Sequence, residues 1–289
     1  MTLRCGVIAI AGTPNAGKST LINRLVGGKV SIVTHKVQTT RFNVRGVCAH
    51  EQTQFIFVDT PGLFDAKKPL EKALVDNAWQ GISDADAVLL IIDGKHGISE
   101  TLATIMQQLQ KRSQLPLYIA INKIDEMDKN ALLALAAACH ELARPQQIFM
   151  ISALKGDGVE DIKKSLAPLM PEGPWHYPED TMSDIPMRLL AAEITREKLF
   201  LNLNQELPYS LAVENESWEE GDTLIKISQV IYVQREGQKK IVIGKGGEGL
   251  KRVGTASRKE LEAMLEKKVH LNLFVKVKDK DFTLIPSTS

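Results

Sequence analysis

With 289 residues the chain is long enough for two domains, and its 36 Lys and Arg against 35 Asp and Glu give an overall charge that points to no class of partner. Its three cysteines show neither metal-ligand spacing nor a paired pattern, which favours a reducing compartment and ordinary packing roles. No apolar stretch has the length of a membrane span, and the short one near the N-terminus leads straight into a polar motif, which argues against a signal peptide.

The first part of the chain, up to about residue 170, alternates apolar runs with helical patterns. Strands are expected at 3–11, 43–50, 54–59, 87–93, 117–122 and 147–151, and helices at 18–25, 70–82, 100–111, 130–142 and 159–169. This alternation predicts an α/β fold with a mostly parallel sheet and helices on both faces. Motifs that follow the strands are therefore expected at the carboxyl edge of the sheet, where such folds bind phosphates.

The first motif is a glycine-rich turn between a predicted strand and a predicted helix. Residues 12–19 read GTPNAGKS, which fits the phosphate-binding P-loop. Glycines let backbone N–H groups point at phosphate oxygens, and the helix N-terminus adds partial positive charge. We expect Lys18 to reach the β- and γ-phosphates and Ser19 to ligate Mg²⁺. The predicted phosphate-binding residues are Gly12, Asn15, Ala16, Gly17, Lys18, Ser19, Thr20 and, from a later motif, Gly62.

Two segments after the P-loop have the composition of nucleotide-sensing switches. A threonine in the polar stretch around residues 38–41 is expected to reach Mg²⁺ only when a γ-phosphate is present, and we favour Thr40 over Thr39. The sequence DTPG at 59–62 follows an apolar run, so its aspartate can hold Mg²⁺ through water and its glycine N–H can meet a γ-phosphate. The predicted switch residues are Thr39, Thr40, Asp59, Thr60, Pro61 and Gly62, and the predicted metal ligands are Ser19, Thr40 and Asp59. A polar surface loop and an ordinary Pro-Gly turn are the alternatives.

Two later motifs predict that the bound base is guanine. The carboxylate of Asp125, in NKID, can accept from both N1–H and the exocyclic amine of guanine, whereas adenine has no N1–H and would leave it unpaired. The stem of Lys123 can cover a base face, and the N–H of Ala153 can meet the guanine O6. The predicted guanine-binding residues are Asn122, Lys123, Asp125, Ser152, Ala153 and Leu154. A strand-end turn with a solvated charge pair is the alternative.

The ordered set GTPNAGKS, TT, DTPG, NKID and SAL resembles that of the translation-factor-related small GTPases. Leu63 stands where Ras-type enzymes carry a water-positioning glutamine. Some relatives that lack this glutamine and carry an asparagine in the P-loop use K⁺ in place of an arginine finger, and Asn15 matches that asparagine. The resemblance therefore implies GTP hydrolysis with Mg²⁺, and it raises K⁺ as a further cofactor.

The chain is predicted to divide into a GTPase domain at 1–170, a linker at 171–183 and a second domain at 184–289. The linker is rich in proline, and we expect Trp175 and Tyr177 to pack at the domain interface. The second domain is predicted to contain helices at 185–203, from 248 through 253, and at 259–268, and strands at 209–213, 224–234 and 269–277.

A G-x-x-G sequence, GKGG at 244–247, lies between helical stretches of the second domain. This order resembles a small α+β KH domain of the bacterial type (type II), whose G-x-x-G loop clamps the backbone of about four nucleotides. Residues 235–280 carry 13 Lys and Arg against 6 Asp and Glu, a net of +7, which is an electrostatic footprint for nucleic acid. The predicted RNA-binding residues are Lys239, Lys240, Gly244, Lys245, Gly246, Gly247, Lys251 and Arg252. For Lys259, Lys267 and Lys268 a solvated helix face is favoured.

A GTPase domain followed by a KH domain resembles the Era family of bacterial ribosome-assembly GTPases. The sequences REK at 196–198, ELPYS at 206–210 and VQREGQKKIVIG at 233–244 match that family. The resemblance implies GTP/GDP and Mg²⁺ as ligands, 16S ribosomal RNA near its 3′ end and the 30S subunit as partners, and no obligate protein partner. It implies a cytoplasmic location, with peripheral association at the inner face of the plasma membrane as an option. Members usually continue into a further helix, for which the sequence DFTLIPSTS at 281–289 offers no counterpart.

Two other function classes stay open on the sequence. The first is a P-loop metabolic kinase, against which NKID and the lack of an obvious substrate lid argue. The second is an RNA-binding protein that holds GTP as a structural ligand without turnover, and Leu63 keeps this reading open.

Overall fold

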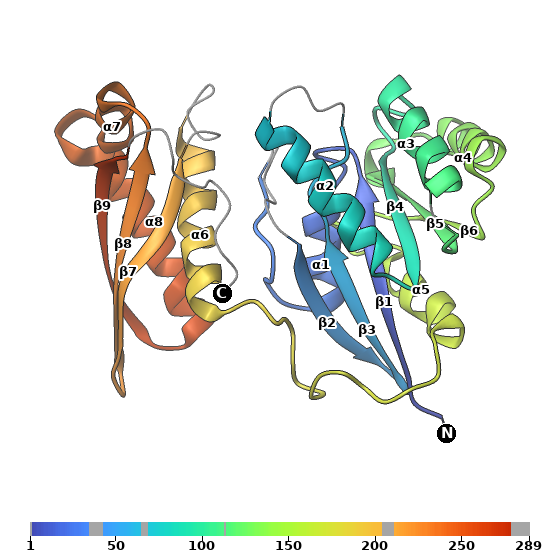
Figure 1. Ribbon diagram of the computed structural model, residues 1–289, viewed down its shortest axis with the longest axis horizontal. Helices are drawn as coiled ribbons and strands as arrows, with labels where there is room; N and C mark the ends of the chain where they lie inside the picture. The colour runs from blue at the N-terminus through green and yellow to red at the C-terminus, as the bar shows by residue number, and fades with distance from the viewer. Residues whose placement is uncertain (1, 35–42, 65–68, 113, 204–210, 279–289) are drawn as a thin grey trace. The chain divides into compact units, whose positions relative to one another are not determined.

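The computed structural model describes residues 2–34, 43–64, 69–112, 114–203 and 211–278. The chain forms two compact units, Met1–Asp184 and Ile185–Ser289 (Figure 1). Thr39 and Thr40, the predicted switch threonines, lie outside the described residues. Within the described ranges, no helix is both long and apolar enough to cross a membrane.

The first unit is built on a six-stranded sheet in the order β2-β3-β1-β4-β5-β6. Only β2 runs antiparallel to its neighbour, and the other pairs are parallel. The strands are β1 Arg4–Gly12, β2 Val44–His50, β3 Thr53–Asp59, β4 Ala87–Asp93, β5 Leu117–Asn122 and β6 Gln147–Met150. The predicted α/β class and mostly parallel sheet are confirmed.

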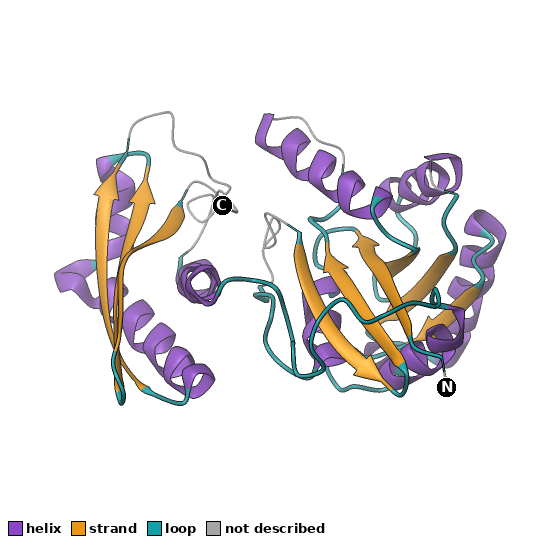
Figure 2. Ribbon diagram, turned by 60° about the horizontal axis from the view of Figure 1, so that its bottom comes forward, coloured by secondary structure: helices purple, strands orange, loops and turns teal. Residues whose placement is uncertain are grey.

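Helices cover both faces of this sheet (Figure 2). The helices are α1 Lys18–Val26, α2 Pro69–Ser83, α3 Glu100–Arg112, α4 Lys129–Ala143 and α5 Val159–Leu166. One core joins α1 and α5 to the sheet side chains that include Ile8 and Ile10, and the other joins α2, α3 and α4 to the side that includes Ala9 and Ala11. Because both faces are covered, every residue of β3 and β4 is buried, and each strand contains a continuous apolar run of at least four residues.

The parallel register brings the predicted motifs to one edge of the sheet. Ile10 lies beside Asp59, and Asp93 lies beside Asn122. The loops that follow β1, β3, β4 and β5 therefore emerge next to one another, as the sequence predicts.

The proline-rich segment 171–184 packs on the first unit. The side-chain oxygen of Gln54 accepts from the backbone N–H groups of His176 at 2.9 Å and Tyr177 at 3.0 Å, and its amide nitrogen donates to the Tyr177 carbonyl at 2.8 Å. The rings of Trp175 and Tyr177, which we expected at a domain interface, pack against apolar residues of β1, β2 and β3. The backbone N–H of Val47 donates to the Met182 carbonyl at 2.8 Å. Specific hydrogen bonds therefore fix this segment along the β2–β3 edge.

The second unit has a three-stranded sheet in the order β7-β8-β9. Its elements are α6 Met187–Asn202, β7 Ala212–Glu220, β8 Leu224–Val233, α7 Glu236–Ile243, α8 Glu248–Leu265 and β9 Lys268–Val277. The β7–β8 pair is antiparallel and the β8–β9 pair is parallel. Helices α6 and α8 bury their apolar residues with those of the strands in two adjoining cores. The predicted small α+β arrangement is confirmed.

Two predicted elements of this unit differ from the structure. The strand predicted at 209–213 begins outside the described residues, and β7 continues to Glu220 because pairing with β8 holds a polar run whose glutamates face solvent. The two helices predicted around 248–253 and at 259–268 form one helix, α8. Gly254 lies inside this helix, where a Cβ would stand 3.4 Å from Leu273 Cδ1 of β9, an ordinary contact distance, so the glycine does not interrupt the helix.

Candidate functional site

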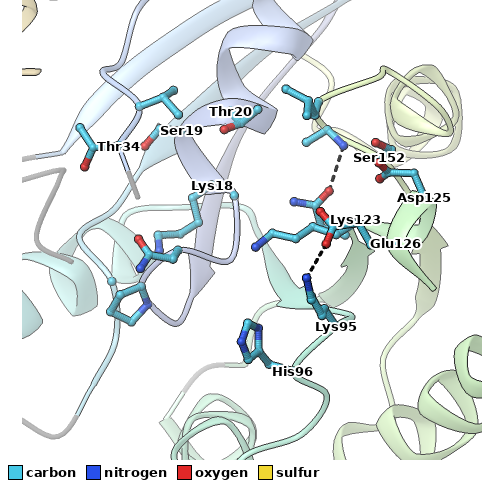
Figure 3. A pocket seen from close by; sticks show the side chains of 18 residues that line it. Lys18, Ser19, Thr20, Thr34, Lys95, His96, Lys123, Asp125, Glu126 and Ser152 are labelled. Atoms are coloured by element: carbon cyan, nitrogen blue, oxygen red, sulfur yellow. Dashed lines mark hydrogen bonds and ion pairs between the residues drawn. The ribbon is translucent and has the colours of Figure 1, made fainter. Parts of the chain in front are cut away.

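A pocket of about 580 Å³ opens at the carboxyl edge of the first unit's sheet (Figure 3). The predicted residues that line it are Asn15, Gly17, Lys18, Ser19, Thr20, Gly62, Asn122, Lys123, Asp125, Ser152, Ala153 and Leu154. Five others, Gly12, Ala16, Asp59, Thr60 and Pro61, do not line it. Val33 and Thr34, which the sequence analysis missed, also line the pocket. Most of the predicted nucleotide residues therefore lie around one cavity.

Lys18 lies inside the turn that joins β1 to α1. Its ammonium donates to the carbonyl oxygens of Gly12 at 3.2 Å and Thr13 at 2.9 Å. Burial lowers the pKa of Lys18 to about 8, and the nearby charge of Asp59 works against this shift. The group is therefore still mostly protonated at neutral pH, and it places a cation where the P-loop pattern predicts phosphate oxygens.

Ser19 and Asp59, two of the three predicted metal ligands, lie side by side. The Ser19 hydroxyl donates to Asp59 Oδ2 at 2.7 Å, and the Ser31 hydroxyl donates to the same oxygen at 2.6 Å. A hydroxyl and a carboxylate beside a phosphate loop are hard oxygen donors of the kind that Mg²⁺ prefers, with phosphates and water completing the shell. The residues present therefore fit a magnesium ion. No motif in the sequence marks Ser31.

Hydrogen bonds to the backbone of β1 fix the DTPG segment in place. The Thr60 hydroxyl donates to the Ile10 carbonyl at 2.8 Å, and the N–H of Leu63 donates to the Gly12 carbonyl at 3.0 Å. A Cβ on Gly62 would stand 3.0 Å from Pro14 Cγ, so this backbone lies directly against the P-loop. The Leu63 side chain is buried in the core with α2 and α3 and does not face the pocket.

The side-chain amide of Asn122 connects the P-loop to the loop that follows β6. Its nitrogen donates to the Ala16 carbonyl at 2.8 Å, and its oxygen accepts from the N–H of Ala153 at 2.9 Å. That N–H, which we predict to meet the guanine O6, is thus held by Asn122 in this structure. A Cβ on Gly17 would stand 2.2 Å from the Asn122 nitrogen, so glycine is required there.

The Asp125 carboxylate lies on the pocket wall next to Ser152 (Figure 3). The hydrogen bond from Ser152 lowers the pKa of Asp125, and Lys155, whose ammonium lies 3.3 Å from Asp125 Oδ2, acts in the same direction. A carboxylate held in its charged form can accept two donors from one base edge.

Several residues that the sequence analysis missed line the pocket near Lys123 and Ala153 or contact residues that line it. Asp93, at the end of β4, accepts from the Lys123 ammonium at 2.5 Å. Lys95 and His96 line the pocket from the loop that follows Asp93. Arg24, on α1, donates to the carbonyl of Ala153 at 3.4 Å and to that of Leu154. The position of Asp93 at the end of an apolar strand is the one sequence signal for these residues. The sequence around Arg24 does not show which loop its side chain contacts.

The G-x-x-G sequence of the second unit forms an exposed turn between α7 and α8. A Cβ on Gly244 would stand 2.9 Å from the backbone nitrogen of Gly249, so the chain passes close to itself there. Gly246 has a φ of +61°, and a Cβ on it would meet no atom within 4 Å. Ile241, which we had not singled out as a contact residue, is 60% exposed beside the turn. The predicted basic residues with exposed side chains are Lys240, Lys245, Lys251 and Arg252, and Lys239 is partly exposed.

Comparison with known families finds one match within each of the two units. Residues 7–123 match a family described as 50S ribosome-binding GTPase, and residues 206–282 match the KH domain family. Over 277 residues the chain is 55% identical to GTPase Era of Sinorhizobium medicae, with 96% of this chain and 89% of that protein covered. Rhizobium meliloti GTPase Era is 53% identical over 277 residues, with 96% and 88% covered. The chain belongs to the Era family of GTPases.

Solved Era structures extend the match to the whole fold. One is Era in complex with MgGDPNP and nucleotides 1506–1542 of 16S ribosomal RNA, with a TM-score of 0.92, 40% identity and coverage of 96% of this chain and 95% of that one. A point variant of Aquifex aeolicus Era bound to GDP·AlF₄⁻ gives the same values. As an Era-family GTPase, the chain converts GTP to GDP and phosphate, so the alternatives of a metabolic kinase and of a GTP ligand without turnover are excluded.

Asp125→Asn should change the preferred nucleotide. The amide can donate to the 2-oxo group of xanthine, but it cannot accept both donors of guanine. We expect GTP to bind at least about tenfold more weakly, the cost of an unsatisfied polar pair, and xanthosine triphosphate to bind more tightly. Competition between the two nucleotides measures the change.

A matched control is Asp128→Asn, which changes the same groups at the N-cap of α4. Asp128 accepts from the N–H groups of Asn130 and Ala131, and asparagine caps helices equally well. An unchanged preference for GTP in Asp125→Asn would remove Asp125 from base selection.

Proposed function

We propose that this Era-family chain is a GTP-controlled switch that binds 16S ribosomal RNA near its 3′ end through the KH domain and assists assembly of the 30S subunit. The observation that carries this proposal is the presence of a lysine-centred phosphate loop and an exposed basic G-x-x-G turn in one chain. The Era protein solved with MgGDPNP and nucleotides 1506–1542 supports the choice of RNA. The proposed domains are 1–170 for GTP, a linker at 171–183, and 184–289 for RNA.

Different loops contribute a positive charge for the phosphates, oxygen ligands for the metal and a carboxylate for the base to the nucleotide site. We assign the phosphates to the P-loop and Lys18, and guanine to the NKID and SAL loops. Mg²⁺ would be held by Ser19, by Asp59 through water and by Thr40, and it would neutralise phosphate charge when bound. We also place the protein in the cytoplasm, and its association with the inner membrane face stays a prediction.

The chain's own side chains provide no water-positioning glutamine after Gly62. Leu63 stands there, and its side chain is 1% exposed within the core. The segment's backbone, fixed against the P-loop, is then left to orient the attacking water. Asn15, which lines the pocket with a left-handed backbone at φ 63°, is the residue we assign to a K⁺ ion that offsets charge in the transition state.

GTP turnover should therefore be faster in K⁺ than in Na⁺ at equal ionic strength. A single added cation at the transferring phosphate is expected to raise kcat by about tenfold or more, since each 1.4 kcal/mol of stabilisation is tenfold. Steady-state phosphate release in the two salts measures the effect. Asn15→Ala should bring the rate in K⁺ down to the rate in Na⁺. Equal wild-type rates in the two salts would refute the role of K⁺.

RNA binding is argued from charge and from access to the backbone. Lys240, Lys245, Lys251 and Arg252 are exposed around a turn whose glycines leave the main chain open. Phosphates can approach such a turn closely, and basic side chains neutralise them. Few aromatic residues lie in this region of the sequence, so clamping of the RNA backbone is favoured over base stacking.

Gly246→Asp should remove most binding of single-stranded RNA and leave the GTPase rate of the free protein unchanged. It places a side chain and a negative charge where a phosphate must lie. We expect a loss of at least tenfold in affinity, measured by fluorescence anisotropy at one fixed salt concentration. Lys245→Ala should weaken binding less and reduce the slope of log affinity against log salt by about 0.7 for single strands.

Gly237→Asp is the matched control, because Gly237 lies in the first turn of α7, where a Cβ would meet no atom within 4 Å. This variant adds the same charge to the same unit, outside the G-x-x-G turn. Equal losses in the two aspartate variants would show a general charge effect and contradict the assigned RNA loop.

A further inference from the structure

The carboxylate of Asp93 contacts two chain segments, its own loop after β4 and the residue that follows β5. It ends β4, beside Asn122 in register, and its side chain is 10% exposed. Its Oδ2 accepts from the Lys123 ammonium at 2.5 Å and lies 3.0 Å from His96 Nδ1, and its Oδ1 accepts from the Lys95 N–H at 3.1 Å. No predicted motif contains this aspartate.

These contacts keep Asp93 charged in a place where charge is costly. Burial works to raise the pKa of Asp93, but the hydrogen bonds from Lys123 and His96 outweigh it, so that the pKa lies below its ordinary value. The carboxylate is thus a fixed anion at neutral pH. It holds one end of the Lys123 side chain in a single position.

Lys123 needs such a partner if its stem is to form a wall for a base. A lysine side chain loses about 1.5–2 kcal/mol of rotamer entropy when it is ordered. Lys123 lines the pocket, and its backbone is left-handed, with a φ of 66°. With the ammonium held by Asp93, that entropy is already lost before a base arrives.

We propose that Asp93 is a positioning residue for guanine-nucleotide binding, which acts by holding the Lys123 ammonium so that the lysine stem lies ready against the face of the purine. The inference rests on the proposed guanine site. It assigns to Asp93 a role in affinity, whereas Asp125 reads the edge of the base.

A neighbouring ion pair shows why Asp93 is the group to test. Lys95 and Glu126 also meet at the pocket, with 2.9 Å between nitrogen and oxygen, but their side chains are 61% and 47% exposed. Exposed pairs contribute little, because water and salt screen them. The side chains of Lys123 and Asp93 are 30% and 10% exposed, so their attraction is screened less.

A double-mutant cycle on GDP affinity tests the proposal. Titration calorimetry would compare wild type, Asp93→Asn, Lys123→Met and the double variant. Asparagine keeps an oxygen for the Lys95 N–H but loses the charge, and methionine keeps an apolar stem without the ammonium. We expect Asp93→Asn to weaken GDP binding about tenfold, or 1.4 kcal/mol, and to have no further effect in the Lys123→Met background.

The ratio of affinities for GDP and inosine diphosphate provides a second reading. Inosine lacks the exocyclic amine that Asp125 is assigned to read, so the ratio should stay at the wild-type value in Asp93→Asn if Asp93 acts only through the lysine stem. Asp161→Asn is the control, because Asp161 forms an exposed ion pair with Lys164 on α5, outside the pocket.

Unchanged GDP affinity in Asp93→Asn, an equal loss in both backgrounds, or a changed inosine ratio would overturn the role of Asp93. Unchanged affinity in Lys123→Met would also overturn it, because the held ammonium would then contribute nothing to binding. The guanine site itself is tested separately by the nucleotide preference of Asp125→Asn. Should thermal unfolding show that Asp93→Asn does not fold, Asp93→Ser carries the same cycle, because a serine hydroxyl can also accept from the Lys95 N–H.

Discussion

The nucleotide site depends on one buried amide. Asn122 is 3% exposed, and its two polar atoms hold the Ala16 carbonyl and the Ala153 N–H, so three loops are fixed to each other at the sheet edge. Gly17 is a consequence of this bridge, because any side chain there would overlap the amide. The residues that we assign to phosphate and those that we assign to the base are therefore arranged before a ligand arrives, which reduces the ordering cost of binding.

The central motifs could be predicted because each follows a strand that is buried on both faces. Such strands are continuous apolar runs, and their parallel register places the following loops together without any further information. Asp93, Ser31 and Arg24 could not be assigned in this way. Their partners lie 30, 28 and 129 or 130 positions away along the chain, so only the folded structure shows which loop each one holds.

Local composition also fails where contacts with other segments decide the structure. The polar segment of β7 has little strand signal of its own, and β8 holds it in place. The proline-rich residues 171–184 have the composition of a linker, yet Gln54 binds their backbone and apolar residues of the first sheet cover their rings. By contrast, the glycines of the G-x-x-G turn could be predicted, because their requirement is local to the chain.

The most direct test of this account is to remove the Asn122 amide and to measure the affinity for one ligand that contains a base and one that does not. Asn122→Ala, studied by titration calorimetry, should bind both GDP and Mg²⁺-pyrophosphate more weakly, because the P-loop loses its contact with β5. Asp125→Ala should weaken the binding of GDP and leave the affinity for pyrophosphate unchanged. If Asn122→Ala weakened GDP alone, Asn122 would be only a base contact, and the claim that one amide orders the whole site would be contradicted.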